Sequence, residues 1–465
     1  MVDQTRSTLV RFARGPVATA GGWAALVLVS VFLGALAVTS VKLLIVLLGA
    51  VALALLVMRP EWAAVGVLIA LPAGLSVPGL PLKVGLSDLL VLVAITGWIV
   101  QDVLRPPEDV RPRAVRPLRV GLLLYAGAAL LTVVLSPSGN AALALFQRGL
   151  IVLGPVLVGA GLVRTGKLRV ALEGYLVACC GLAVAAVAES GADNILAVQK
   201  NPAGGYLTVG LILAVVLRPG RRWIGYAALL AVGSLATQSR GALLGLAAGA
   251  VVTVLVVRYR ERRRLVLSFG AATGLLVLGY LTLPSAARER LLRASATDDF
   301  SVRYRQNYQA DALDAFQAHP WFGEGVGNYN GGIRQPGISD PHQVLYLQLA
   351  EGGVVLLAAF VVLIGLSLWL ALRHAVRSPL AVAALAVQLS TLVHALGDVY
   401  WVRGTPTMGF LLVGALVAAV DYAGRHDERG LEWLAARRRG LDTVAPLVPL
   451  AANGAARDGA AHRHA

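Results

Sequence analysis

The sequence predicts an all-α integral membrane protein with about fourteen transmembrane helices, in a range of about 12 to 14, and one large, mostly helical extracytoplasmic loop. Hydrophobic residues make up 57% of the 465 residues and charged residues only 14%, whereas about 25% of a soluble domain is charged. The Lys and Arg residues, which give a net charge of +16, form short clusters between apolar runs. This pattern is typical of cytoplasmic loops and argues against a nucleic-acid partner.

The apolar runs give the positions of the expected helices. A helix that crosses a bilayer needs about 20 mostly apolar residues, within a range of about 17 to 25. Several runs are at the short end of this range and the first two nearly touch, so the expected count carries a margin of about two. The runs lie near 23–40, 41–58, 62–79, 86–101, 118–135, 143–163, 168–188, 203–218, 222–238, 240–257, 265–283, 343–372, 379–396 and 406–423.

The distribution of basic residues predicts the orientation of these helices. With the amino terminus in the cytoplasm, 29 of the 41 Lys and Arg residues fall on the cytoplasmic side. They include the clusters RPPEDVRPRAVRPLR at 105–119 and RYRERRR at 258–264, and seven arginines after residue 423. Because Lys and Arg in short loops remain on the cytoplasmic side, we expect a multi-pass protein of the inner (plasma) membrane with both termini in the cytoplasm.

One connection, residues 284–341, is longer and more polar than the others, and the orientation places it on the outer face. Connections of this length are usually functional or disordered. The sequence predicts a helix that Ser301 caps and that runs to Ala318, with Pro320 ending it. The glycine-rich segment WFGEGVGNYNGG follows. We therefore expect a folded cap rather than a linker.

The chain has two cysteines, Cys179 and Cys180, which are adjacent in an apolar run and provide neither a disulfide framework nor a CxxC site.

The apolar runs, the long connection and the basic clusters divide the chain into five parts. The expected parts are a cytoplasmic amino terminus at 1–22, transmembrane helices 1–11 at 23–283, the extracytoplasmic loop at 284–341, transmembrane helices 12–14 at 342–423, and a basic cytoplasmic tail at 424–465.

Several arginines depart from the cytoplasmic distribution. Arg240 lies in the short connection TQSRG between two apolar runs. A basic residue at the bilayer centre costs about 2.5–3.5 kcal/mol, so an arginine held at the membrane boundary favours contact with an anion. Lipid phosphates reached by snorkelling are one candidate, and a diphosphate held bidentately by converging guanidinium groups is the other. Six further outer arginines lie in the loop, namely Arg288, Arg290, Arg293, Arg303, Arg305 and Arg334.

Two ionisable residues follow where the loop re-enters the membrane. His342 begins the segment HQVLYLQLAEGG, and Glu351 lies nine residues later, about two and a half helical turns deeper. A histidine in this place is either a helix-start residue or a group that accepts a proton near neutral pH. An intramembrane carboxylate is either a functional group or a buried partner that joins two helices. The acidic residues of the loop have no ligand-like spacing, so no metal site is expected.

Three motifs lie in this region, namely Ser239-Arg240-Gly241, the segment HPWFGEGVGNY at 319–329, and His342 followed by Glu351 and Gly353. They resemble the motifs of the O-antigen ligase and polymerase family of polytopic membrane glycosyltransferases. Their order and their predicted side of the membrane match this family, and together they cover residues 237–355. The rest of the chain resembles the family only as a body of many helices, of the GT-C-like type.

This resemblance implies an enzyme that takes a glycan from a polyprenyl (undecaprenyl) diphosphate carrier on the outer face of the membrane. The acceptor would be a sugar hydroxyl on another glycan, a lipid or a protein, in the assembly of cell-surface polysaccharide. Arg240, with Arg303 or Arg305, would bind the donor diphosphate and stabilise its developing charge. His342 would act as the general base. The diphosphate is already an activated leaving group, so no cofactor is expected.

Other residues are expected to support this site. The resemblance implies supporting roles for Glu351, Tyr308 and Arg334. The aromatic residues Tyr308, Trp321 and Tyr329 either stack on sugar rings or pack the core of the cap. One departure concerns the residue after the histidine, where the family usually has Asn and this chain has Gln343.

Two alternatives to a glycosyltransferase remain open at this stage. A transporter or flippase of polysaccharide or lipid-linked oligosaccharide would use the same carrier without catalysis. Transporters usually show internal repeats and mid-membrane ionisable residues; the sequence shows no repeat, and Glu173 is the main acidic residue near a span centre before the loop. A scaffold subunit would use the loop only to bind a partner. Ligase and polymerase share their donor chemistry and are not separated by these motifs.

Overall fold

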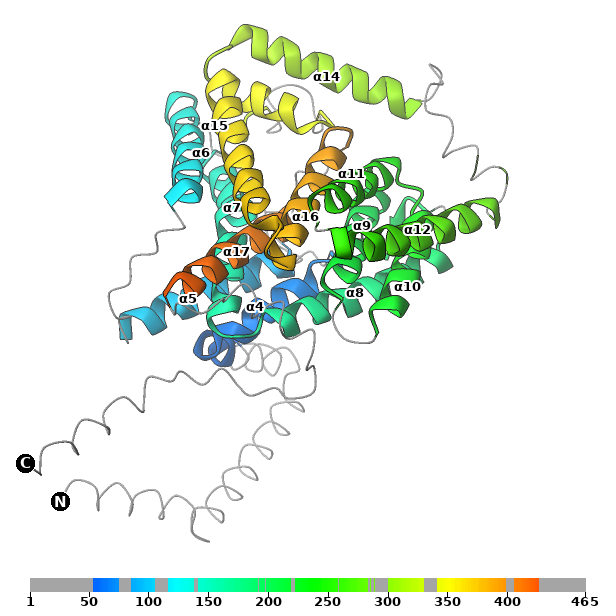
Figure 1. Ribbon diagram of the computed structural model, residues 1–465. Coiled ribbons are helices and arrows are strands. Elements are labelled where there is room, and N and C mark those ends of the chain that lie inside the picture. The colour runs from blue at the N-terminus through cyan, green and yellow to red at the C-terminus, as the bar shows by residue number, and fades with distance from the viewer. Residues whose placement is uncertain are drawn as a thin grey trace, which may run out of the picture. The chain divides into compact units, whose positions relative to one another are not determined.

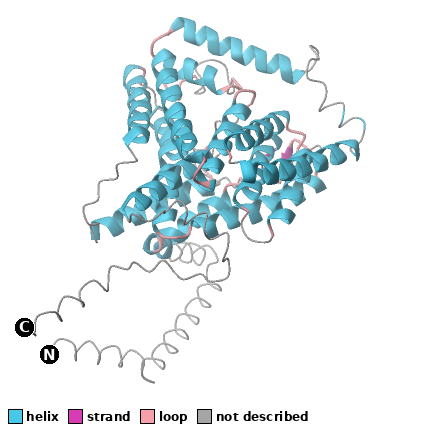
Figure 2. Ribbon diagram, viewed as in Figure 1, coloured by secondary structure: helices cyan, strands magenta, loops and turns pink. Residues whose placement is uncertain are grey.

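The computed structural model of this chain is almost entirely helical in the part that it describes (Figures 1 and 2). The chain forms two units, Met1–Arg59 and Pro60–Ala465, and the following description concerns the second. Within the described residues, the strands are limited to a small antiparallel hairpin of β1 (Asn194–Ile195) and β2 (Val198–Gln199). Apart from two isolated positions, the described residues are 53–74, 85–104, 116–137, 141–190, 192–196, 198–218, 222–257, 259–282, 300–329, 341–398 and 405–425.

The described helices follow the predicted apolar runs closely. The first two runs, 23–40 and 41–58, lie almost entirely outside the described residues. The helices that coincide with the other runs are α4 (Pro60–Ala70), α5 (Leu86–Leu104), α6 (Arg116–Leu135), α7 (Ala141–Arg164), α8 (Leu168–Ala188), α9 (Lys200–Leu217), α10 (Trp223–Ala236), α11 (Arg240–Val256), α12 (Tyr259–Thr282), α15 (Val344–Ala375), α16 (Pro379–Ala395) and α17 (Thr407–Arg425).

Seven of these helices, namely α5 to α9, α12 and α15, are long and apolar enough to cross a membrane, as judged within the described residues. Five more, α4, α10, α11, α16 and α17, are apolar but shorter. α4 ends at Ala70, although its apolar run continues to 79. Pro72, which lacks an N–H donor, and Gly74, which has a φ of 57°, account for this end. The chain is therefore a multi-pass helical membrane protein.

Small residues allow the helices of this unit to pack closely. α7 lies against α17, α6 against α15, and α16 against both α9 and α11. An added Cβ at Gly159 of α7 would overlap the carbonyl oxygen of Leu411, and one at Gly414 of α17 would overlap the carbonyl oxygen of Val156. Such close approach of backbones is typical of helices that associate within a membrane, where apolar burial provides no driving force between them.

The connection 284–341 contains a helix close to the predicted one; it ends at Ala318 as expected but begins one residue before Ser301, the expected cap. α14 (Phe300–Ala318) lies across the end of α15 (Figure 1). The turn at 319–329, called the glycine turn below, follows it directly, and we refer to 300–329 as the cap. Small and aromatic side chains close the contact between the cap and α15. This buried cluster consists of Ala312, Ala315, Tyr329, Leu347 and Ala350.

Candidate functional site

A break in α15 creates the place where the glycine turn binds. Gly353 has a φ of 60° and a ψ of −158°, so α15 consists of two helical pieces. In an uninterrupted helix each N–H bonds the carbonyl four residues earlier, but at this break the glycine turn supplies the partners. The replacement hydrogen bonds run from Val354 N to Pro320 O (2.9 Å), Val355 N to Trp321 O (3.3 Å), Glu324 N to Ala350 O (2.9 Å) and Gly325 N to Glu351 O (3.0 Å).

Two glycines permit this insertion, and they explain why the motifs contain them. Gly323 has a φ of 61° and Gly353 a φ of 60°, values that residues with a Cβ rarely adopt. An added Cβ at Gly323 would overlap the backbone of Glu351 and Gly352, and one at Gly353 would overlap the backbone of Trp321. The glycine turn and the Glu-x-Gly segment are therefore two halves of one backbone contact.

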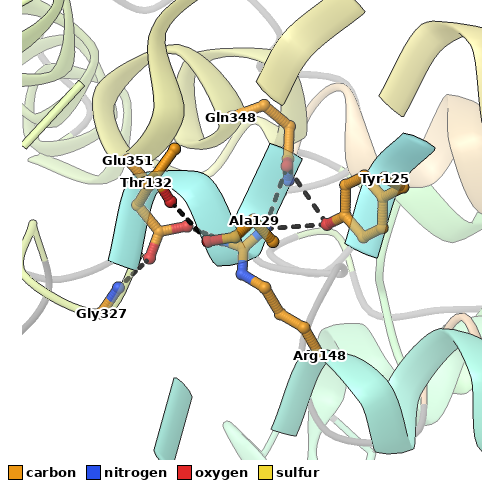
Figure 3. Close-up of polar contacts among 7 residues, drawn as sticks. All are labelled: Tyr125, Ala129, Thr132, Arg148, Gly327, Gln348 and Glu351. Atoms are coloured by element: carbon orange, nitrogen blue, oxygen red, sulfur yellow. Dashed lines mark hydrogen bonds and ion pairs between the residues drawn. The ribbon is translucent and has the colours of Figure 1, made fainter. Parts of the chain in front are cut away.

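Directly beside this contact, Glu351 belongs to a buried polar cluster between α6, α7 and α15 (Figure 3). Its carboxylate forms an ion pair with Arg148 of α7. Its Oε1 also accepts a hydrogen bond of 3.1 Å from the backbone N–H of Gly327 in the glycine turn. Arg148 Nη1 donates to Tyr125 Oη (2.8 Å) and to Gln348 Oε1 (3.0 Å), and the Tyr125 hydroxyl donates to Gln348 Oε1 (3.2 Å). Three helices and the glycine turn meet at this cluster.

The far end of the glycine turn is held by Ser136, the residue that directly follows α6. The Asn328 side-chain amide donates to the carbonyl of Ser136 at 3.0 Å and to that of Glu324 at 2.8 Å. The Tyr329 hydroxyl donates to the carbonyl of Tyr308 at 3.1 Å, which joins the turn to α14. The turn is thus fixed between α6, α14 and α15.

His342 lies at the start of α15 and faces an acidic residue that the sequence analysis did not single out. Its Nδ1 is 3.5 Å from Oδ1 of Asp398, a carboxylate that follows α16 and is only 6% exposed. The other oxygen of Asp398 is 3.5 Å from Nη2 of Arg305, whose Nη1 donates to the Gly397 carbonyl at 3.1 Å. The Tyr308 ring stacks on the imidazole with a centroid separation of 6.2 Å. One carboxylate therefore joins the histidine to a loop arginine.

The backbone of His342 and the side chain of Gln343 form the start of α15, where this chain has Gln343 in place of the usual Asn. His342 has a φ of 56°, which is unusual for a residue with a Cβ and is often associated with functional positions. Gln343 is the N-cap of α15, and its side-chain oxygen accepts a hydrogen bond of 2.8 Å from the N–H of Tyr346. Asn is a preferred N-cap residue, so Gln343 performs the cap that the usual Asn would provide.

Arg240 lies at the start of α11, close to the last turn of α16. It is the first residue of α11, is partly buried, and follows the N-cap Ser239, which accepts from Ala242 N. The next residue, Gly241, packs against the ring of His394, and an added Cβ there would lie 2.7 Å from its Cδ2. His394 is in the last turn of α16, four residues before Asp398. α16 therefore connects the Ser-Arg-Gly segment with the group around His342.

Of the residues expected from the sequence, His342, Arg305 and Tyr308 lie together around Asp398. Glu351 belongs to the separate cluster with Arg148, and Arg240 lies at the start of α11. Tyr308 and Tyr329 are buried in the core of the cap, whereas Trp321 is 66% exposed. The side chain of Arg303 and the whole of Arg334 lie outside the described residues. Within the described part, no group of three or more His, Cys, Asp or Glu residues is placed to hold a metal ion.

Two residues of this region were missed by the sequence analysis, and each carries a signal. Arg148 is the one basic residue within the apolar run 143–163, and an ionisable residue inside a membrane span is a functional suspect by default. Asp398 stands in the segment GDVYW directly after an apolar run. Its importance depends on His342 and Arg305, which no local pattern links to it.

The fold and this region define a class of protein: a helical membrane protein whose ionisable groups gather beneath a folded cap at one end of its helices. Comparison with known proteins then shows which family part of this chain resembles. Residues 225–361 match the model of the O-antigen ligase family. An O-antigen ligase of Pseudomonas aeruginosa is 28% identical over 140 residues, which are 30% of this chain and 29% of that protein. The resemblance to this family is thereby confirmed for the segment that carries the motifs.

Proposed function

We propose that this protein is a membrane glycosyltransferase that moves a glycan from a polyprenyl diphosphate carrier to a sugar hydroxyl on the outer face of the membrane. In the reaction, the acceptor oxygen bonds to the anomeric carbon, the bond from that carbon to the diphosphate oxygen breaks, and the acceptor proton passes to a base. The acceptor is a glycan, a lipid or a protein. The match to the O-antigen ligase family over residues 225–361 supports the class of reaction.

The pairing of His342 with Asp398 supports the acceptor half of this mechanism. Because Nδ1 faces the Asp398 carboxylate, Nε2 is the nitrogen that would accept the proton from the hydroxyl. The carboxylate would hold the imidazole in orientation and stabilise the imidazolium that forms, as the acidic member of a catalytic triad does. This pairing, at the junction of cap and membrane, is the observation that carries the proposal.

The arrangement of arginines supports the donor half. Arg240 lies at the start of α11, where the helix dipole favours an anion. Arg305 is partly exposed and lies against the same carboxylate as His342, so a second guanidinium is adjacent to the base. A diphosphate between Arg240 and Arg305, with Arg303 and Arg334 as further candidate ligands, would leave with its negative charge stabilised.

The membrane body suits a carrier with a long isoprenoid chain. The distribution of arginines in the sequence favours cytoplasmic termini and an extracytoplasmic cap, so the aqueous acceptor and the lipid-borne diphosphate would meet at His342. A nucleotide would not be required, since the carrier diphosphate is already activated. Because ligation and polymerisation differ only in the acceptor, the product identifies which of them occurs.

The test is transfer in liposomes that contain the purified protein, a polyprenyl diphosphate-linked glycan and candidate acceptors. We expect the His342→Ala variant to bind the donor but to lose transfer by about 10²–10⁴-fold, the usual contribution of general acid–base catalysis. His319→Ala is the matched control, because His319 is exposed at the end of α14. Near-wild-type transfer by His342→Ala would refute the mechanism. Donor crossing the bilayer without a new glycosidic bond would identify a flippase instead.

A further inference from the structure

Arg148 is a largely buried cation in a membrane-spanning helix, and the proposed mechanism does not use it. It lies in the first half of α7, and its side chain is 13% exposed. A basic residue at the centre of a membrane span costs about 2.5–3.5 kcal/mol on insertion scales, and less toward its ends. Its guanidinium is engaged by the Glu351 carboxylate, the Tyr125 hydroxyl and the Gln348 amide oxygen. Since these groups already balance its charge, Arg148 is poorly placed to bind a diphosphate.

The ion pair reaches the cap through Glu351. The same carboxylate that pairs with Arg148 accepts the backbone N–H of Gly327 at 3.1 Å. The backbone carbonyl of Glu351 also accepts the N–H of Gly325. Removing Arg148 would leave a buried carboxylate without its compensating charge, a change that is strongly destabilising locally. The carboxylate would then take up water or a proton, and in either case its hold on the glycine turn would change.

From the glycine turn, a short series of contacts leads to His342. Tyr329, two residues after Gly327, donates its hydroxyl to the carbonyl of Tyr308 at 3.1 Å. The ring of Tyr308 stacks on the imidazole of His342, with the two planes inclined by 21°. The position of the glycine turn therefore influences the ring against which His342 rests.

We propose that Arg148 is a positioning residue: through its ion pair with Glu351 it fixes the glycine turn, and through Tyr329 and Tyr308 it sets the orientation of His342. This inference rests on the proposed transfer reaction. A buried ion pair is often no more stabilising than apolar side chains of the same volume, so stability alone does not explain why an ion pair occupies this position. The need for a fixed hydrogen-bond acceptor for the Gly327 N–H does explain the ion pair, because an apolar residue at 351 could not provide this acceptor.

The experiment compares four proteins in liposomes: wild type, Arg148→Gln, Glu351→Gln and the double variant. We expect each single variant to lose kcat by about tenfold or more per folded molecule, since a misplaced catalytic group costs up to about 10²-fold. The donor KM should stay within about threefold of wild type. The double variant carries no unpaired charge and keeps an acceptor for Gly327, so it should recover most of the kcat.

Two controls separate positioning from general stability. Arg169→Gln removes an arginine from an ion pair with Glu173 in which both side chains are well exposed; such pairs contribute little, and kcat should not change. Tyr329→Phe removes only the hydroxyl that reaches the Tyr308 carbonyl, and it should lower kcat several-fold without changing the donor KM. This variant keeps the test decisive if Arg148→Gln does not fold.

Hydrogen exchange gives a readout that does not depend on activity. In Arg148→Gln the backbone amides of the glycine turn should exchange faster, whereas in Arg169→Gln they should not. Unchanged kcat per folded molecule in the single variants or in Tyr329→Phe, or a rise in donor KM in place of a fall in kcat, would overturn the positioning role. If the wild-type protein itself shows no transfer, the proposed function fails, and the exchange data then report separately whether the ion pair holds the turn.

Discussion

Replacing Gly353 by alanine tests whether the break in α15 depends on glycine. Gly353 has a φ of 60° and a ψ of −158°, a combination that is essentially restricted to glycine and costs other residues on the order of 1–3 kcal/mol. The new Cβ would also overlap the backbone of Trp321, and forcing extra atoms into a packed contact costs about 1–3 kcal/mol. Partial relaxation relieves some of this, so we expect a loss of about 2–4 kcal/mol.

The loss should appear first at the glycine turn. If the turn moves away to make room, the four hydrogen bonds that replace the helical ladder weaken together. Hydrogen exchange of Glu324 and Gly325 should therefore accelerate, and the thermal unfolding temperature in detergent should fall. Transfer should fall as well, because the same turn leads through Tyr329 to the ring beside His342.

A matched control is available in the same helix. Gly365 of α15 has open space where a Cβ would be added, and alanine is favoured over glycine in a helix by about 1 kcal/mol. Gly365→Ala should therefore be neutral or slightly stabilising, with unchanged exchange of the turn. Equal stability and equal exchange in Gly353→Ala and Gly365→Ala would refute the argument that the break requires glycine.

Three further predictions concern the site and its orientation. Arg240→Lys keeps the charge but loses the planar fork that binds a diphosphate bidentately, so most transfer should be lost in the liposome assay; full activity would reduce Arg240 to a lipid anchor. Asp398→Asn should lower kcat more than donor affinity, because it removes the carboxylate that His342 and Arg305 share; an unchanged kcat would exclude Asp398 from the mechanism. A cysteine in place of the exposed Gln317 of α14 should react with a membrane-impermeant thiol reagent in cells whose outer layers are permeabilised; labelling only after lysis would contradict an extracytoplasmic cap.

The sequence alone was sufficient to locate most of the described helices. Apolar runs predict spans because unpaired backbone groups are not tolerated in lipid, so a long apolar segment has to be helical there. The end of α14 at Ala318 was predicted from Pro320, which acts locally, whereas the expected cap Ser301 lies inside the helix. The motifs in the sequence also indicated His342, Arg240 and Glu351 as candidate functional residues, because charged residues and histidine are rare near such apolar segments.

Partners remote in the sequence could not be predicted in this way. Gln348 and Arg148 are 200 residues apart, and no periodicity indicates that α7 places Arg148 against Glu351. Similarly, Asp398 became recognisable only when α16 and the cap were seen to bring His342 and Arg305 to the same carboxylate. Tyr308 was compatible with either stacking on sugars or core packing, and its burial depends on how α14 lies on α15.

What the sequence by itself determined is therefore the local chemistry: a body of apolar helices, a polar cap, and the residue types able to hold an anion and accept a proton. What only the tertiary structure decided is which of these groups meet. Gly353 illustrates the division, since the sequence marks a glycine that weakens a helix, but only the fold shows a distant turn completing its hydrogen bonds. The reason is that backbone preferences and hydrophobicity act between near neighbours, whereas ion pairs and inserted turns depend on how whole helices pack.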